Sequence, residues 1–264
     1  MHSDAFDRYH HGHSFIHDLD PRVKVVVTVG FILSNALLPD GAWTAFALAW
    51  MFVLVASYFS ELGFGFTFRR SFIALPFALA AITVLFSIPG KPVTSFQFLM
   101  WHFTITDAGL LRFASIVIRS WLSVQMAILL VAVTEFPKIV HALRHLRVPA
   151  VLTVIISFLY RYLFVLADEV LRLLRAREAR SARAAGRGAG GSVLWRARVT
   201  GNMAGQLFLR SYERSDRVYN AMRSRGYTGE LMTIHSHHVH ASDWLIALLS
   251  FVCLMIMQVV GRAL

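Results

Sequence analysis

Two arginine-bearing segments are the part of this sequence whose residue types and spacing best suit a specific interaction. Residues 169–181 read E-V-L-R-L-L-R-A-R-E-A-R-S, and residues 214–226 read R-S-D-R-V-Y-N-A-M-R-S-R-G, at an offset of 45 residues. Three aligned positions are identical and two hold small residues in both copies: Arg172 and Arg217, Ala176 and Ala221, Arg180 and Arg225, Ala179 and Ser224, Ser181 and Gly226. The chain therefore carries one pattern twice.

The spacing puts each Arg, Ala, Arg set on one face of a helix, because residues four apart are neighbours there. A guanidinium group forms bidentate, charge-assisted hydrogen bonds with carboxylates, and a small residue beside it lets a partner come close. The pattern thus predicts two helix ends that dock into acidic grooves. A pair of solvated basic helix faces is the alternative.

Both segments resemble the paired Ala-Arg-Gly motifs of the transmembrane T component of energy-coupling-factor (ECF) transporters. The matching residues are Glu169, Arg172, Ala176, Ala179, Arg180 and Ser181 in the first motif, and Arg217, Ala221, Met222, Arg225, Gly226 and Tyr227 in the second. Ser181 replaces the first glycine of the strict triplets and Ser224 replaces the second alanine, while residues 182–184, A-R-A, form a competing triplet. The cobalt-type T component, CbiQ, is the most similar member, through L-D-P-R-x-K at 19–24, L-R-V-P at 146–149 and R-Y-L-F-V-L-x-D-E at 161–169.

This resemblance implies a non-catalytic coupling subunit of an ATP-driven cobalt importer. Its partners would be two ATPase subunits, which hold ATP and Mg²⁺, a membrane subunit that binds the Co²⁺ substrate, and a small accessory membrane subunit as a further candidate. The chain itself would bind no cofactor. The motif residues at 172, 176, 179–181, 217, 221 and 224–226 would contact the ATPases.

The composition predicts a membrane protein. The chain of 264 residues is 56% hydrophobic and only 16% charged, whereas soluble domains carry about 25% charged residues. Its net charge of +11 is concentrated in one segment, since residues 135–240 hold 17 Lys and Arg against 7 Asp and Glu. A basic excess confined to one internal segment fits the positive-inside rule better than a nucleic-acid footprint, so we expect no nucleic-acid partner.

The apolar runs predict an all-α polytopic protein of about five transmembrane helices in the inner (plasma) membrane, with a cytoplasmic N-terminus. The expected spans are residues 23–38, 42–59, 72–88, 110–133 and 243–260, and residues 89–107 are expected to form an external loop. The expected domains are an N-terminal bundle of four spans at 1–134, a cytoplasmic coupling domain at 135–240 and a last transmembrane helix at 241–264.

The coupling domain is expected to consist of three helices and a glycine-rich turn. Residues 136–146 predict an amphipathic surface helix, and residues 193–225 a long helix with Phe208, Ser211, Tyr212, Ser215, Tyr219 and Met222 on one face. The turn is expected at 186–191. The apolar residues 150–167 are interpreted as the membrane-dipping start of a long helix that does not cross, because crossing would put one basic segment outside.

Histidines and one arginine within a predicted span leave further alternatives open. His10, His11, His13 and His17, and then His235, His237, His238 and His240, form two clusters that suit a transition metal, so a membrane-embedded metalloenzyme is the alternative function. Solvated interfacial histidines are the competing interpretation, and no defined metal site is predicted. Arg119 is expected either to contact the substrate subunit or to pair within the chain, with Asp107 as a candidate.

Overall fold

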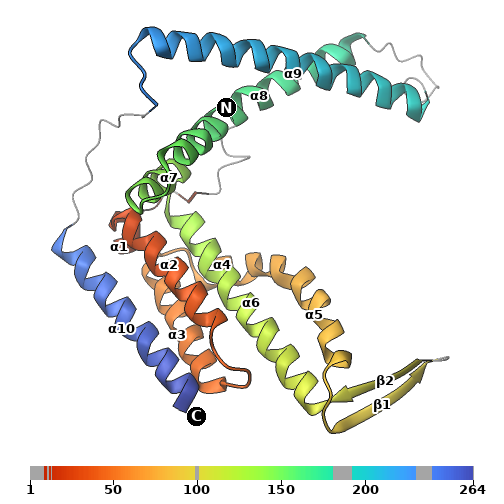
Figure 1. Cartoon of the computed structure of the whole chain (residues 1–264), viewed down its shortest axis with the longest axis vertical. Coiled ribbons are helices and arrows are strands. Elements are labelled where there is room, and N and C mark those ends of the chain that lie inside the picture. Colours follow the sequence, from red (N-terminus) through yellow and green to blue (C-terminus); the bar gives the residue numbers. More distant parts are fainter. Residues whose placement is uncertain are drawn as a thin grey trace. The chain divides into compact units, whose positions relative to one another are not determined.

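The fold was obtained as a computed structural model, which describes residues 9, 10, 12, 14–98, 101–180, 192–229 and 240–263 (Figure 1). The described residues form two compact units. The bundle unit consists of residues 9–142 and 240–263, and the crossed-helix unit of residues 143–180 and 192–229. The division resembles the expected separation of spans from a coupling domain.

The bundle unit is built almost entirely from helices. In chain order it contains α1 (Phe15–Asp18), α2 (Pro21–Ala36), α3 (Trp43–Phe59), α4 (Phe64–Arg70), a 3-10 helix (Ser71–Ala74), α5 (Leu75–Ser87), strands β1 (Pro92–Phe98) and β2 (Trp101–Thr106), α6 (Asp107–Val133) and α10 (Ala241–Ala263). Helix α7 (Phe136–His145) has residues in both units. The predicted all-α polytopic class is confirmed.

The segment expected to be an external loop contains an antiparallel hairpin. Strands β1 and β2 pair from Phe98 and Trp101 back to Pro92 and Thr106, with an irregularity between Pro92 and Thr94. Valine, threonine and aromatic residues favour extended pleated backbone. Their enrichment on both sides of residues 99–100 favours a hairpin within the expected external loop.

The start of α2 confirms the helix beginning expected at the L-D-P-R motif. The Asp20 carboxylate accepts a hydrogen bond from the Arg22 backbone N–H at 2.8 Å, and Pro21 occupies the first turn. The Asp243 carboxylate accepts from the backbone N–H of Asp20 at 3.4 Å and from that of His240 at 2.8 Å. One buried carboxylate therefore ties the beginnings of α2 and α10 together.

Helices α2, α3, α6 and α10 share one hydrophobic core. Its members are Phe31, Leu38, Ala42, Ala45, Phe46, Ala49, Val53, Leu122, Met126, Leu254 and Met257. Small residues allow close contact, as interhelical packing in membranes requires. A Cβ atom on Gly261 would lie 2.7 Å from a methyl carbon of Leu38 and 3.2 Å from the Cβ of Ala45, so α10 approaches the α2–α3 turn closely.

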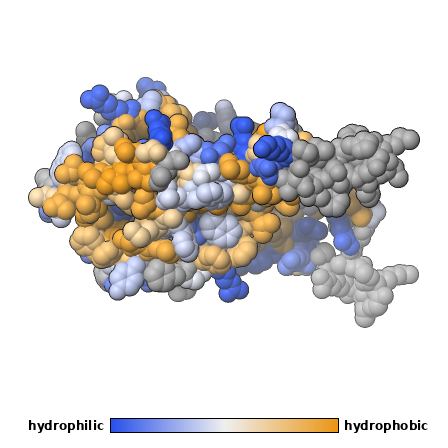
Figure 2. Space-filling model, turned by 90° about the horizontal axis from the view of Figure 1, so that it is seen from below, coloured by the Kyte–Doolittle hydropathy of each residue, from blue (hydrophilic) through white to orange (hydrophobic). Residues whose placement is uncertain are grey.

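The outer surfaces of these helices are apolar. Large exposed side chains include Trp50, Met51, Val55, Leu248, Leu249 and Phe251, and apolar residues cover large areas of the molecule seen from below (Figure 2). Soluble proteins rarely expose such continuous apolar surface. The surface therefore suits contact with lipid.

Three described helices are long and apolar enough to cross a membrane: α6, α10 and α8 (Ala150–Arg180). A fourth candidate is a bent pair, Gly65–Ala74 with Leu79–Phe86, at 58° to each other. Helices α2 and α3 fall below that length, with 16 and 17 residues. By this measure the described residues give three or four candidates, α8 among them, where five spans were predicted.

Candidate functional site

Two long helices carry the repeated motif. Helix α8 runs without a break from Ala150 to Arg180, which confirms the expected continuous helix, and α9 runs from Val193 to Ser224. The α9 N-terminus is capped by Ser192, whose hydroxyl accepts from the Trp195 N–H at 3.3 Å. These are the longest helices among the described residues.

The second motif ends in a tight helix C-cap. The N–H of Tyr227 donates to the carbonyl of Met222 at 3.0 Å, and that of Gly226 to Arg223 at 3.0 Å. Gly226 has a φ of +83°, a conformation that other residues rarely adopt. This Schellman arrangement confirms the helix end expected at Gly226, and it leaves Arg225 at the last position before the chain turns away.

Helices α8 and α9 cross (Figure 1), and Glu169 of α8 joins them by a contact with Arg210 of α9. Its two carboxylate oxygens accept separate hydrogen bonds, from Arg210 of α9 at 2.7 Å and from Arg172 of α8 at 2.7 Å. The Glu169 side chain is 13% exposed, whereas Arg210 is 55% exposed. The hydrogen bond from Arg210, helped by the charges of Arg172 and Arg214, lowers the pKa of Glu169 below its ordinary value of 4.5. The carboxylate is therefore charged at neutral pH.

An apolar groove of about 520 Å³ lies between the first half of α8 and the second half of α9. Its lining residues are Val154, Phe158, Leu159, Tyr162 and Leu166 from α8, Ser211, Arg214, Ser215, Val218, Tyr219 and Met222 from α9, and Tyr227. Four of the six residues expected on one α9 face line this groove. Phe208 and Tyr212, the other two, are 68% and 60% exposed.

The predicted motif residues lie exposed at two separate helix ends. Arg172, Ala176, Ala179 and Arg180 occupy the last turns of α8, and Arg217, Ala221, Ser224, Arg225 and Gly226 occupy the end of α9. At 1.5 Å per residue, Arg180 lies about 16 Å along α8 from Glu169, and Arg225 about 22 Å along α9 from Arg210. The structure thus brings the middle of α8 and the middle of α9 together at the Glu169–Arg210 contact. Residues 170–180 of α8 and 211–225 of α9 extend from this contact toward the two motif arginines, and we call these two segments the arms.

Some of the predicted features lie outside the described residues. These are Ser181, the competing triplet at 182–184 and the glycine-rich turn at 186–191. The sequence analysis included Glu169 only as a motif match and missed Arg210. The i, i+3 pair of Glu169 with Arg172 is visible in sequence, but the partnership with Arg210 depends on how the two helices cross.

Arg119 pairs within the chain, but with a different partner from the candidate named above. Its guanidinium donates to the Asp40 carboxylate at 2.7 Å and to the Leu38 carbonyl at 2.6 Å, and Arg112 lies 3.6 Å from the same carboxylate. Asp107 was the wrong candidate because the turn between α2 and α3 carries Asp40 against the side of α6. Asn35 donates to the Arg119 carbonyl at 2.9 Å, which adds a second link between α2 and α6.

The histidine clusters fall largely outside the described residues, which include only His10, His17 and His240 of the eight. His17 is already engaged, since its ring nitrogens lie 2.6 Å from the Ser14 hydroxyl and 3.1 Å from the His10 carbonyl. Within the described part of the chain, no three His, Cys, Asp or Glu side chains are placed to share a metal ion.

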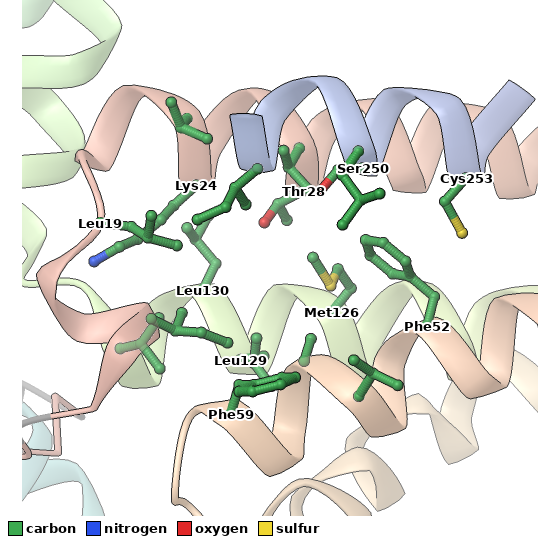
Figure 3. A pocket seen from close by; sticks show the side chains of 18 of the residues that line it. Leu19, Lys24, Thr28, Phe52, Phe59, Met126, Leu129, Leu130, Ser250 and Cys253 are labelled. Atoms are coloured by element: carbon green, nitrogen blue, oxygen red, sulfur yellow. The ribbon is translucent and has the colours of Figure 1, made fainter. Parts of the chain in front are cut away.

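The bundle unit also contains an apolar cavity of about 630 Å³ between α2, α3, α6 and α10. Thr28, Phe52, Met126 and Cys253 are among its lining residues, and the Lys24 amino group lies at one end (Figure 3). That amino group donates to the His17 carbonyl at 2.9 Å. Apart from Lys24, Thr28 and Ser250 the lining is mainly apolar, so the cavity suits an apolar group better than a polar substrate.

A known protein family matches most of this chain, including helices α8 and α9. The CbiQ family, described as cobalt transport protein, matches residues 12–235, a range that includes both arginine motifs and the Glu169 contact. This chain belongs to the CbiQ family.

Relatives of this CbiQ-family chain extend over most of its length. It is 25% identical to the energy-coupling factor transporter transmembrane protein EcfT of Lacticaseibacillus paracasei, over 91% of this chain and 92% of that protein. The EcfT protein of Thermosediminibacter oceani is 27% identical over 84% of this chain and 83% of its own length. An uncharacterised protein of Methanocaldococcus jannaschii is 28% identical over 94% and 83%. The resemblance to an ECF transmembrane component is confirmed.

Proposed function

We propose that this chain couples ATP hydrolysis in two partner ATPase subunits to cobalt uptake by a substrate-binding membrane subunit. The observation that carries the proposal is the pair of exposed arginines, Arg180 and Arg225, at the ends of two long crossed helices. The family description, cobalt transport protein, supports the choice of substrate. Co²⁺ is then cargo held by the partner subunit, and ATP and Mg²⁺ belong to the ATPases.

The separation of the two motifs favours two docking sites. Arg180 and Arg225 project from arms that diverge from the Glu169 contact, so one small acidic groove would not take both. A helix end also carries partial negative charge on its last carbonyl groups, which stabilises an adjacent arginine. When a carboxylate groove closes over such an end, the ion pair is desolvated and becomes sensitive to loss of either member.

The stiffness of the arms suits the transmission of force. Each motif lies on a continuous helix of more than 30 residues. Because the backbone hydrogen bonds of the helix are unbroken, a displacement of the helix end also moves the point where α8 and α9 cross. Closure of an ATPase dimer would move the two tips relative to each other. The apolar groove between α8 and α9 then offers a surface on which the substrate subunit could respond.

The arginines are tested by purifying the tagged chain from membranes of its native host and photolabelling the complex with azido-ATP. The wild type is expected to retain two labelled subunits per chain. Arg180→Ala or Arg225→Ala should weaken retention by about 2–5 kcal/mol at the affected contact, and the double variant should retain neither. Arg196→Ala, on the exposed first turn of α9, is the matched control and should retain both.

A double variant that keeps both ATPases and normal cobalt uptake would refute the docking role. The metalloenzyme alternative predicts instead that the isolated chain holds stoichiometric metal and shows turnover, and metal analysis of the same preparation tests it. We also propose that the chain lies in the plasma membrane with its N-terminus and both motifs on the cytoplasmic side.

A further inference from the structure

We propose that Glu169 is a positioning residue that holds α8 and α9 at the crossing angle which spaces Arg180 from Arg225. The inference deepens the proposed function and rests on it. Three arginines act on this one carboxylate: Arg172 on its own helix and Arg210 on α9 donate hydrogen bonds to it, and Arg214 on α9 adds its positive charge. Glu169 supplies the only negative charge among these four groups.

The Glu169 carboxylate neutralises arginines on two helices, so its contact links α8 to α9. With the carboxylate present, Arg172 and Arg210 each donate to a different oxygen at 2.7 Å, so α8 and α9 are bridged through one group. Without it, cationic side chains of the two helices would face each other with no anion between them. Like charges at this range repel, so removal of Glu169 is expected to open the crossing as well as to loosen it.

A small change in the crossing angle of α8 and α9 displaces the motif arginines by several ångströms, because they lie far from the crossing. Rotation by about 10° at the Glu169 contact displaces Arg180 by about 3 Å and Arg225 by about 4 Å, given arms of about 16 and 22 Å. A charge-assisted hydrogen bond tolerates only a few tenths of an ångström of misplacement. Both arginines cannot therefore stay seated on a rigid pair of grooves if the crossing angle drifts.

The neighbouring groove does not provide a substitute for the carboxylate. Its lining is mostly apolar and occupies the opening between α8 and α9 on the side of Val154 and Met222. Close interdigitation of side chains is what fixes the crossing angle of packed helices, and the open groove separates these two helix faces. The directional contact at the crossing is the hydrogen-bonded bridge of Glu169 with Arg210.

The test compares four variants of the full chain, produced with its ATPase and substrate partners. Glu169→Gln removes the charge, and Arg210→Gln approaches the same contact from α9. The exchange Glu169→Arg with Arg210→Glu preserves one carboxylate among three arginines and should restore the bridge. Glu213→Gln is the matched control, because Glu213 is 67% exposed and pairs only loosely, at 3.9 Å, with Arg217 of its own helix.

Two measurements separate positioning from simple support of the fold. Spin labels at Arg175→Cys and Arg223→Cys, on a Cys253→Ser background, report the spacing of the arms by pulsed electron paramagnetic resonance. ATP-dependent uptake of radioactive cobalt and ATP hydrolysis are measured on the unlabelled complexes. Glu169→Gln and Arg210→Gln are expected to shift or broaden the label distance by about 3 Å and to lower uptake at least tenfold while hydrolysis continues.

The exchanged pair should recover the wild-type distance and uptake to within about threefold, a result that loss of folding would not give. An unchanged label distance in Glu169→Gln, or an exchanged pair that recovers neither readout, would overturn the positioning role. Failure of the proposed function is distinguishable, because the wild-type complex would then lack two azido-ATP-labelled subunits.

Discussion

At the scale of single residues, the structure separates arginines that hold the protein together from arginines that are offered to a partner. Arg119 is 20% exposed and pairs with Asp40, whereas Arg180 and Arg225 are exposed at the ends of their helices. No ion pair to Arg180 or Arg225 occurs among the residues that the structure describes. Exposure and pairing therefore assign two different tasks to one residue type.

The Arg119 contact leads to a stability prediction. Arg119→Gln should destabilise the chain because Asp40 and the Leu38 carbonyl lose their shared donor, and a double-mutant cycle with Asp40→Asn should give a coupling free energy of about 0.5–3 kcal/mol. Thermal unfolding in detergent measures both. Arg112→Gln, at 3.6 Å and 57% exposed, is the control and should couple more weakly. Equal coupling for the two arginines would contradict the assignment.

Sequence and structure agree best where the pattern is local. Asp20 and Pro21 predict the beginning of α2, and Gly226 predicts the end of α9, because capping depends on residues a few positions apart. The partners of Arg119 and Glu169 could not be predicted in the same way. Asp40 and Arg210 lie 79 and 41 residues from them, and only the packing of the helices brings these side chains together.

At the scale of elements, the last turn of α9 depends on the C-cap that Gly226 forms. Gly226→Ala forces a Cβ into positive φ, which costs about 1–2 kcal/mol, and the last turn that presents Arg225 should fray. We expect weaker ATPase retention in the azido-ATP experiment and faster hydrogen exchange at residues 222–227. These effects should appear without a loss of α8 helicity.

Gly201 provides the matched glycine within the same helix. It is helical, and a Cβ there meets nothing within 4 Å. Gly201→Ala should therefore stabilise α9 by about 0.5–1 kcal/mol and leave ATPase retention unchanged. If both glycine variants behaved alike, the C-cap of α9 would have no special part in docking.

The hairpin shows the limit of element prediction from sequence. Residues 89–107 were expected to be an external loop, and the pairing of β1 with β2 inside that loop was not predicted. Helix lengths were predicted more accurately, since residues 193–225 were expected and Val193–Ser224 is observed. A long helix can be recognised from the periodicity of its own sequence, whereas a short strand is recognised only together with the strand that it pairs with.

At the scale of the whole molecule, the proposed function has α8 remain on one side of the membrane. The proposed function requires that Lys138, Arg175 and Arg217 share the cytoplasmic side and that Lys91 lies opposite. Single cysteines at these positions, with Cys253 replaced by serine, can be labelled with a membrane-impermeant maleimide in intact cells and in inverted vesicles. Only Lys91→Cys should react in intact cells, and reaction of Arg175→Cys there would contradict the shared side.

The lengths of the bundle helices have a consequence for the surrounding lipid. As spanning helices, α2 and α3 would cover only about 24 Å and about 26 Å, against a hydrocarbon core of about 30 Å, while α6 would reach about 40 Å. Lipid next to α2 and α3 must thin, and α6 must tilt, at a cost of fractions of a kcal/mol per ångström of mismatch. A neighbouring protein with equally short spans would relieve that thinning, so bilayer elasticity itself would draw it to the α2–α3 side.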